Sequence, residues 1–156
     1  MPIRWMTEAA AREFLGAQTE GRLATSDSAG QPYITPLNYL FRDGKIYLHS
    51  KLTGRKLENI AGNCRVCFEV STVEKIIPLL DRPCGCATRY TSVLAFGAAR
   101  VLSDNTEQAA LLNLLVERYA AGKPYQPVTE KDAAGCAVVE ILIDQISGKR
   151  NVDPEP

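Results

Sequence analysis

The dipeptide Asp43-Gly44 restricts the fold more than any other feature of the sequence. It separates two runs of strand-forming residues, 33–41 and 46–50. Asp-Gly between two such runs is the strongest short-range signal for a β-hairpin, because both residues tolerate the positive φ angles of a tight two-residue turn. Residues 27–32 form a second, polar turn signal. The sequence therefore predicts an antiparallel meander.

Pro36 lies inside the first of these runs. Proline has no N–H group to donate to a strand ladder, so in sheets it occurs on edge strands or at bulges. We therefore expect an edge or a bulge here, where backbone polar groups are free for something other than a neighbouring strand.

Two segments show the hydrophobic period of an amphipathic helix. The first covers residues 7–18, and Thr7 is placed to cap its N-terminus. The second covers residues 106–119, with Asp104 or Asn105 as its cap. The leucine stripe of this second helix is expected to pack on the sheet.

The remaining segments add further strands. Strands are expected over residues 65–70, 91–102 and 137–146 and a short basic helix around residues 54–60, while the apolar stretch 76–80 stays unassigned. Hairpins dominate, and helices do not alternate regularly with strands. The pattern therefore favours a mostly β or α+β fold with an antiparallel, barrel-like sheet over a parallel βαβ fold.

Length and charge limit the class of protein. The chain has 156 residues, 46% of them hydrophobic, and no apolar run near the roughly 20 residues of a membrane span. Its 18 basic residues balance 18 acidic ones, which argues against a nucleic-acid surface and for a small-molecule or protein partner. The first residues lack the layout of a signal peptide. We expect one cytoplasmic domain over residues 1–148, a tail over 149–156, and no membrane association.

The five cysteines are an odd number, and three lie in apolar or strand-like surroundings, which predicts reduced thiols and no structural disulfide. The pairs Cys64/Cys67 and Cys84/Cys86 lack the spacing of a zinc ribbon, and Cys67 falls in a predicted strand, so no metal site is expected. Cys84 or Cys86 could face a ligand pocket, with an inert buried thiol as the alternative. A redox role for this pair stays open.

Small hydroxyl residues, a glycine and three cations follow the second strand of the hairpin: Ser50, Lys51, Thr53, Gly54, Arg55 and Lys56. Free N–H groups at a helix start, the positive end of its dipole, the hydroxyls and the cations could converge on a phosphate group. The spacing matches neither a Walker A loop nor the dinucleotide G-x-G-x-x-G fingerprint. The alternative interpretation is a solvated, basic helix face.

His49 is the only histidine, and it precedes this cluster directly. It is a candidate proton donor, ligand contact or axial metal ligand, with a structural role as the alternative. The sequence has no G-x-S-x-G motif, so a Ser-His-Asp hydrolase is not supported. Tyr90 and Ser92 would suit a polar aromatic ligand if they met the basic cluster in space.

The order of these segments resembles the pyridoxamine 5'-phosphate oxidase-like superfamily of FMN-binding split barrels, in particular its nitroimidazole-resistance-type branch. The segments that carry the resemblance are 36–39, 46–50, 53–56, 66–70, 90–93 and 96–97. The resemblance covers roughly residues 3 to 148. It implies a six-stranded antiparallel split barrel with flanking helices, and a homodimer with one flavin in each of two clefts between the subunits.

The resemblance also implies positions for the cofactor. The segment that holds the ribityl phosphate corresponds to His49, Ser50, Lys51, Gly54, Arg55 and Lys56. The strand along the isoalloxazine ring corresponds to Pro36, Leu37, Asn38 and Tyr39. A strand that approaches the cofactor from the other subunit corresponds to Ser92 and Val93. The phosphate segment coincides with the cation cluster found from the residues alone.

The function implied by the resemblance is a flavin-dependent oxidoreductase. The expected cofactor is FMN, with FAD as the alternative. NAD(P)H or another carrier would donate electrons to a nitroaromatic or quinone-like small-molecule acceptor, and His49 and Tyr39 are the candidates for proton supply near the ring.

Two other functions stay open: a flavin-binding or sensor protein without turnover, and a heme protein that uses His49. Residues 149–151 do not match the arginine–histidine substrate segment of true pyridoxamine 5'-phosphate oxidases, which argues against that substrate.

Overall fold

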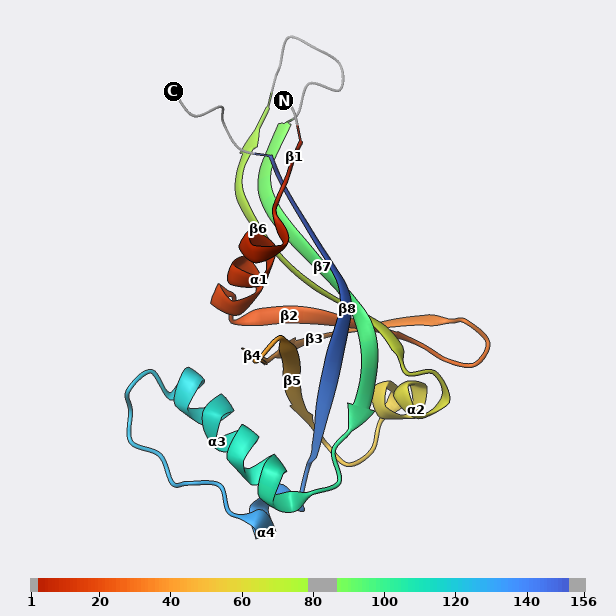
Figure 1. Cartoon of the computed structure of the whole chain (residues 1–156), viewed down its shortest axis with the longest axis vertical. Helices are drawn as coiled ribbons and strands as arrows, with labels where there is room; N and C mark the ends of the chain where they lie inside the picture. Colours follow the sequence, from red (N-terminus) through yellow and green to blue (C-terminus); the bar gives the residue numbers. More distant parts are fainter. Residues whose placement is uncertain (1–2, 79–86, 152–156) are drawn as a thin grey trace.

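One antiparallel sheet runs through the chain (Figure 1). The computed structural model describes residues 3–78 and 87–151. The strands are hydrogen-bonded in the order β3-β2-β6-β7-β8-β5-β4, and β1 pairs with the end of β8. Their bounds are β1 Arg4–Trp5, β2 Glu20–Ser26, β3 Pro32–Asn38, β4 Leu40–Arg42, β5 Lys45–Ser50, β6 Arg65–Ile77, β7 Ala87–Val101 and β8 Ala137–Asn151.

The predicted antiparallel fold is confirmed, and in the described ranges the sheet has eight strands where six were expected. β1 has only two residues and β4 only three, so the other six strands form the expected framework. β4 arises because the run 33–41 divides at Tyr39 into two strands. In the described part of the chain, the terminal strands β3 and β4 do not pair, so the sheet stays open like a split barrel.

The predicted hairpin joins β4 to β5. Its turn residues Asp43 and Gly44 have φ angles of 51° and 76°. Both values lie in the left-handed region that a two-residue hairpin turn requires. Pro36 lies on β3, an edge strand, where its missing N–H group is tolerated.

The described part of the chain has four helices that flank the sheet: α1 Glu8–Ala17, α2 Arg55–Gly62, α3 Asn105–Ala120 and α4 Glu130–Ala133. The predicted caps form, because Thr7 accepts from the amide of Ala10 and Asp104 accepts from two amides of α3. The short α4 was not predicted, although Thr129 and Asp132 form a capping box at its start. Within the described residues, no helix combines the length and apolar character that crossing a bilayer requires.

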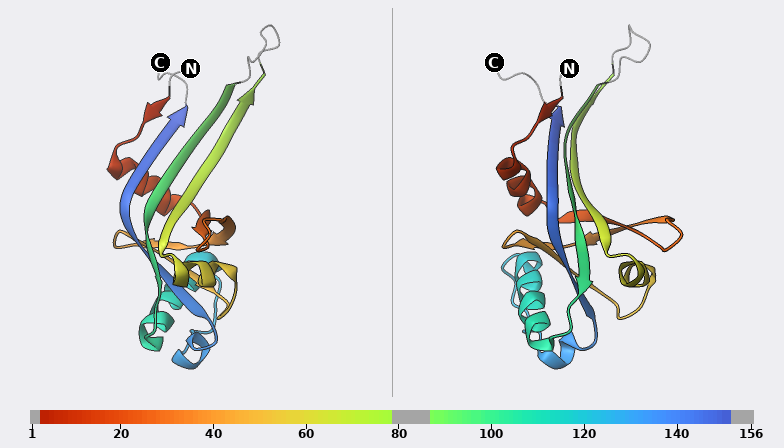
Figure 2. Two further views of the ribbon diagram at one scale, coloured as in Figure 1. Left: turned by 90° about the vertical axis from the view of Figure 1, so that its right-hand side faces the viewer. Right: turned by 45° about the vertical axis from the view of Figure 1, so that its right-hand side comes forward.

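The long strands β6, β7 and β8 lie side by side along the molecule (Figure 2). β6 takes in Ile76 and Ile77, which the sequence left unassigned. β8 continues to Asn151 because it stays paired with β7 as far as Tyr90, so residues 149–151 belong to the strand and not to the predicted tail. Cys84 and Cys86 lie outside the described residues.

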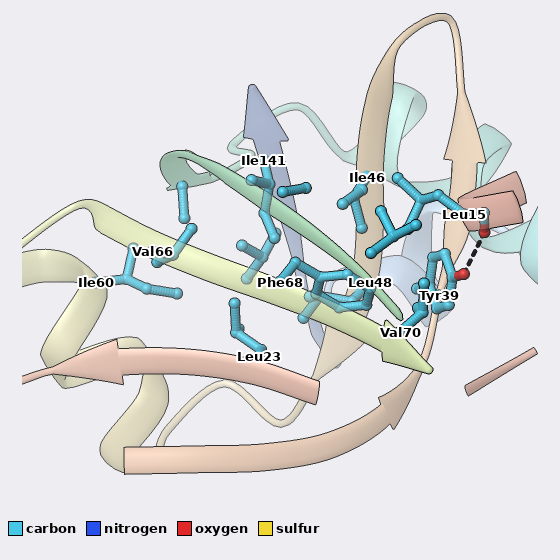
Figure 3. Packing of buried hydrophobic residues seen from close by; sticks show 14 of the residues in the cluster. Leu15, Leu23, Tyr39, Ile46, Leu48, Ile60, Val66, Phe68, Val70 and Ile141 are labelled. Carbon is cyan, nitrogen blue, oxygen red and sulfur yellow. Dashed lines mark hydrogen bonds between the residues drawn. The ribbon is translucent and has the colours of Figure 1, made fainter. Parts of the chain in front are cut away.

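Two apolar clusters lie on opposite faces of the sheet, because side chains alternate along each strand. The inner cluster joins α1 and α2 to the sheet through residues such as Leu15, Ile60 and Phe68 (Figure 3). The outer cluster joins α3 and α4 to the sheet, with Leu112 of α3 and Tyr47 of β5 among its members. The predicted packing of the leucine stripe on the sheet is thus confirmed.

Candidate functional site

A pocket of about 280 Å³ opens where β3, β5 and the start of α2 meet. The strands β3 and β5 are not neighbours in the sheet, and they approach each other here because the sheet curls around the inner cluster. We call this the cradle pocket, and its lining residues are Tyr33, Thr35, Ser50, Lys51, Thr53, Gly54, Arg55 and Lys56. All the residues predicted for phosphate contact line it except His49.

The start of α2 presents uncapped backbone to the cradle pocket. Gly54 has a φ of 137°, which glycine adopts without strain, and no described side chain caps the helix. Leu57 and Glu58 both donate their N–H groups to the Gly54 carbonyl, at 2.9 and 3.1 Å. The amides of Arg55 and Lys56, at the positive end of the helix dipole, are therefore available to an anion.

Two amide side chains hold α2 against β2. Asn59 Nδ2 donates to Thr25 Oγ1 at 2.9 Å, and Asn63 Nδ2 donates to Ser26 Oγ at 2.9 Å. Ile60 adds a buried side chain to the inner cluster. These contacts fix the helix start beside the strands that form the rest of the pocket.

The three cations of the pocket have different surroundings. Arg55 is engaged within the protein, because its guanidinium carbon lies 5.1 Å from the ring centroid of Tyr33 and a guanidinium nitrogen lies 3.8 Å from Asp27 Oδ2. Lys51 is exposed. Lys56 is half-buried, and burial lowers the pKa of its ammonium group. No described carboxylate pairs with Lys51 or Lys56, and because Lys56 is less exposed to water, its charge is the one that most needs a bound anion.

Thr35 also indicates that the pocket is built for a ligand. Its Oγ1 atom is buried and has no hydrogen-bond partner among the described residues. Leaving such a group unpaired costs about 1–3 kcal/mol. The uncapped helix start, the half-buried ammonium group and this hydroxyl are all donors of the kind that a phosphate group accepts.

His49 does not reach the cradle pocket. Side chains alternate along β5, so Ser50 faces inward and His49 faces outward. His49 lines a second pocket, of about 260 Å³, together with Asn38 and residues of α3. The structure therefore separates His49 from the phosphate-contacting group with which the resemblance placed it.

The residues expected along the isoalloxazine ring are likewise divided between the outer face of the sheet and the core. Pro36 is exposed on the outer face, whereas Leu37 packs against the inner cluster. Tyr39 is fully buried, its hydroxyl donates to the carbonyl of Leu15, and burial raises its pKa (Figure 3). Because this hydroxyl is committed to the core, Tyr39 is not available for proton supply, and His49 remains as the candidate.

Ser92 and Val93 lie away from the cradle pocket of their own chain. Ser92 lines a hollow of about 90 Å³ with Trp5 and Lys149, and Val93 is fully buried in the inner cluster. The side chain of Val93 therefore belongs to the core. The assignment of Ser92 and Val93 to a strand that approaches a cofactor in the other subunit stays a prediction.

Sequence reasoning missed Tyr33 and Thr35 as members of the site. Both point inward from β3, where the period-two alternation places them on the same face as Leu37. That alternation was visible in the sequence, but the curl that brings β3 to α2 was not.

The thiols that the structure describes are free. Cys64, Cys67 and Cys136 form no disulfide in the described ranges, and burial raises the pKa of Cys67 and Cys136. The same ranges contain no group of three or more His, Cys, Asp and Glu side chains that could hold a metal ion.

Comparison with known proteins identifies the family. A family model described as pyridoxamine 5'-phosphate oxidase matches residues 7–150. No curated protein matches the chain. A protein from Bacteroides thetaiotaomicron, proposed to confer 5-nitroimidazole antibiotic resistance, is similar in structure with a TM-score of 0.79 and 21% identity, over 96% of this chain and 89% of the other.

Two further solved structures share the fold. An FAD-binding protein from Mesorhizobium loti has a TM-score of 0.73 and 25% identity, over 97% of this chain and 100% of the other. A flavocytochrome from Azotobacter vinelandii has a TM-score of 0.83 and 21% identity, over 97% of this chain and 70% of the other. Because the family model spans nearly the whole described structure, the chain belongs to the pyridoxamine 5'-phosphate oxidase family.

Proposed function

We propose that the protein binds FMN, with the phosphate group of the flavin in the cradle pocket. The observation that carries this proposal is the convergence of Lys56, the free amides at the start of α2 and the unpartnered Thr35 hydroxyl on one pocket. Family membership supports it, as do similar structures whose proteins are an FAD-binding protein and a flavocytochrome.

The residues of the pocket fit a phosphate monoester. Lys56 would supply the balancing charge, the amides of Arg55 and Lys56 would donate to the phosphate oxygens, and Ser50 and Thr35 would add hydroxyl contacts. Arg55 would keep Tyr33 and the helix start in position, because its own charge already faces Asp27. A bound flavin would supply the electron-transfer chemistry, since no side chain of the pocket does so.

The reaction that we propose is an FMN-dependent oxidation–reduction with NAD(P)H or another carrier as donor. A nitroaromatic or quinone-like compound is the proposed acceptor, and the likeness to the protein from Bacteroides thetaiotaomicron supports the nitroaromatic class. His49 is the proposed proton donor, because its side chain is exposed and no described residue is hydrogen-bonded to it.

We further propose a cytoplasmic homodimer with the flavin between the subunits. The helices α3 and α4 cover one part of the outer face of the sheet, and outside that part it carries large apolar side chains that no described helix covers: Ile34 is 62% exposed, Phe96 38% and Leu142 44%. Exposed apolar side chains gathered on one part of a surface are typical of a protein–protein interface. The free thiols fit a reducing compartment.

The absorption spectrum of the purified protein, followed by mass analysis of any released cofactor, tests the proposal. A two-band flavin spectrum with a mass of FMN is the expected result. A Soret band that disappears in His49→Ala would favour the heme alternative, which the exposed His49 ring permits. Flavin that binds but is not reduced by NADH or NADPH, nor reoxidised by an acceptor, would favour a sensor without turnover.

A further inference from the structure

We propose that the pocket between α3 and β5 binds a small, uncharged, single-ring aromatic compound whose polar substituent faces His49 and Asn38. We call it the α3 pocket, and its lining residues are Asn38, His49, Leu112, Leu115, Val116, Tyr119 and Val128. The assignment of this ligand as the electron acceptor rests on the proposed flavin function. The binding of such a ligand in the α3 pocket does not depend on that function.

The α3 pocket has an apolar floor and a polar rim. Leu112 and Leu115 are buried in the outer cluster, and Val128 is packed against that cluster. His49 and Asn38 are exposed and come from the strands β5 and β3. Pockets for small molecules commonly combine apolar walls with a few polar groups that fix the orientation of the ligand.

The polar groups at the rim are free to bind a ligand. No described residue is hydrogen-bonded to the side chains of His49 or Asn38. The hydroxyl of Tyr119, in contrast, is used within the protein, because it accepts from the Tyr39 amide at 3.0 Å and lies 2.7 Å from the carbonyl oxygen of Thr19. The hydrogen bonds to a ligand would therefore come from the imidazole and the carboxamide.

The size and charge of the pocket limit the ligand. A cavity of about 150 Å³ with apolar walls holds benzene, so 260 Å³ accommodates one substituted ring. Among the residues that the structure describes, no Lys, Arg, Asp or Glu side chain lines the pocket. This distinguishes it from the cradle pocket, whose cations suit an anion.

The α3 pocket and the cradle pocket share the same two strands. Ser50 lines the cradle pocket and its neighbour His49 lines the α3 pocket, so the two pockets lie on opposite faces of β5. β3 contributes Thr35 to one pocket and Asn38 to the other. A ligand in the α3 pocket would thus lie at the same split of the sheet as the proposed flavin phosphate.

Fluorine NMR with 4-fluorobenzamide tests this proposal on the full chain, with and without FMN. The probe has one ring and an uncharged amide, and its affinity is measured in parallel with FMN affinity. Val116→Phe fills the pocket from α3, while Glu117→Phe places the same side chain on the neighbouring, exposed position as a matched control. His49→Leu removes the imidazole at similar bulk and covers the case that Val116→Phe fails to fold.

We expect the wild type and Glu117→Phe to bind the probe, and Val116→Phe and His49→Leu to lose at least about tenfold in affinity for it. FMN affinity should stay the same in Val116→Phe and Glu117→Phe. Equal probe affinity in all the variants, or no binding by the wild type in either form, would overturn the proposal. Probe binding without any FMN binding would support the α3 pocket and contradict the proposed flavin function, so the two failures are distinguishable.

Discussion

Lys56 is the side chain on which the proposed phosphate site depends most. It is half-buried, and no described carboxylate balances its charge. Lys56→Ala removes one charge-assisted hydrogen bond, worth about 1.5–3 kcal/mol, so the dissociation constant for FMN should rise roughly 10- to 150-fold in a fluorescence titration. Lys123→Ala, on an exposed loop, is the control and should leave the affinity unchanged. Equal affinities for both variants would remove Lys56 from the site.

Glu140 is a buried carboxylate that three side chains from neighbouring strands satisfy. It accepts from Lys45 Nζ at 2.9 Å, from Arg100 Nε at 2.7 Å and from the Tyr47 hydroxyl at 3.2 Å. Burial raises the pKa of Glu140, but the hydrogen bonds and charges of the two cations outweigh it, so this pKa lies below its ordinary value.

The lowered pKa of Glu140 predicts a pH dependence of stability. As the pH falls below about 4.5 the unfolded chain takes up this proton while the native chain does not, so the free energy of unfolding decreases until the pH passes the native pKa. Glu140→Gln should weaken this acid dependence and cost about 1.5–3 kcal/mol at pH 7, measured by urea unfolding. Unaltered acid dependence in Glu140→Gln would contradict this role.

At the residue scale, the sequence was sufficient to predict the pocket residues that follow each other in the chain. It was insufficient for the residues that the sheet brings to the pocket from distant segments. The cluster from Ser50 to Lys56 was predicted because these residues follow each other at a helix start. Tyr33 and Thr35 were missed because they reach the pocket from another strand. His49 lines the α3 pocket because the strand alternation turns its side chain to the opposite face from Ser50, and its assignment to the cofactor stays a prediction.

Gly97 is the glycine that the pairing of β7 with β8 requires. The register shifts between Phe96 and Gly97, and a Cβ atom at Gly97 would overlap the carbonyl oxygen of Leu142. Gly97→Ala should therefore destabilise the protein by about 1–3 kcal/mol or more. Gly62→Ala is the control, because nothing lies within 4 Å of its Cβ position. Calorimetric melting of both variants checks this, and equal Tm values would contradict the strand geometry.

At the element scale, local signals predicted most elements but not their lengths. Thr7 and Asp104 marked two helix starts, and Asp43-Gly44 marked the hairpin. The long strands β6 and β8 extend beyond the expected segments because their pairing with β7 continues past the ends of those segments. Pairing of this kind depends on residues far apart in the sequence, so propensity alone does not determine where a strand ends.

The whole molecule presents an apolar patch of Ile34, Phe96 and Leu142 on the part of the outer sheet face that α3 and α4 leave exposed, and we proposed that a second copy of the chain binds there. Phe96→Glu places a charge at this face and should shift the protein from dimer to monomer in light scattering, with loss of FMN if the cofactor lies between the subunits. Tyr125→Glu changes an exposed aromatic residue away from the sheet and serves as the control. A dimer that persists in Phe96→Glu would contradict this interface.

At the scale of the whole molecule, the antiparallel architecture followed from hairpin signals, but the strand order did not. The order β3-β2-β6-β7-β8-β5-β4 places β5 beside β8 and leaves β3 at the opposite edge. Pairings between distant segments of this kind are set by the packing of the complete core. The resemblance implied an antiparallel split barrel, which the open antiparallel sheet confirms, but it gave no strand order.

The central claim is that the cradle pocket holds the phosphate group of a flavin, and comparing the affinities of the apoprotein for FMN and riboflavin tests it most directly. The two ligands differ only in the phosphate group. Riboflavin therefore cannot accept the charge-assisted hydrogen bonds that the pocket would donate to that group, and FMN should bind at least about 100-fold more tightly than riboflavin. Equal affinity for both ligands, or no binding of FMN at all, would contradict the claim.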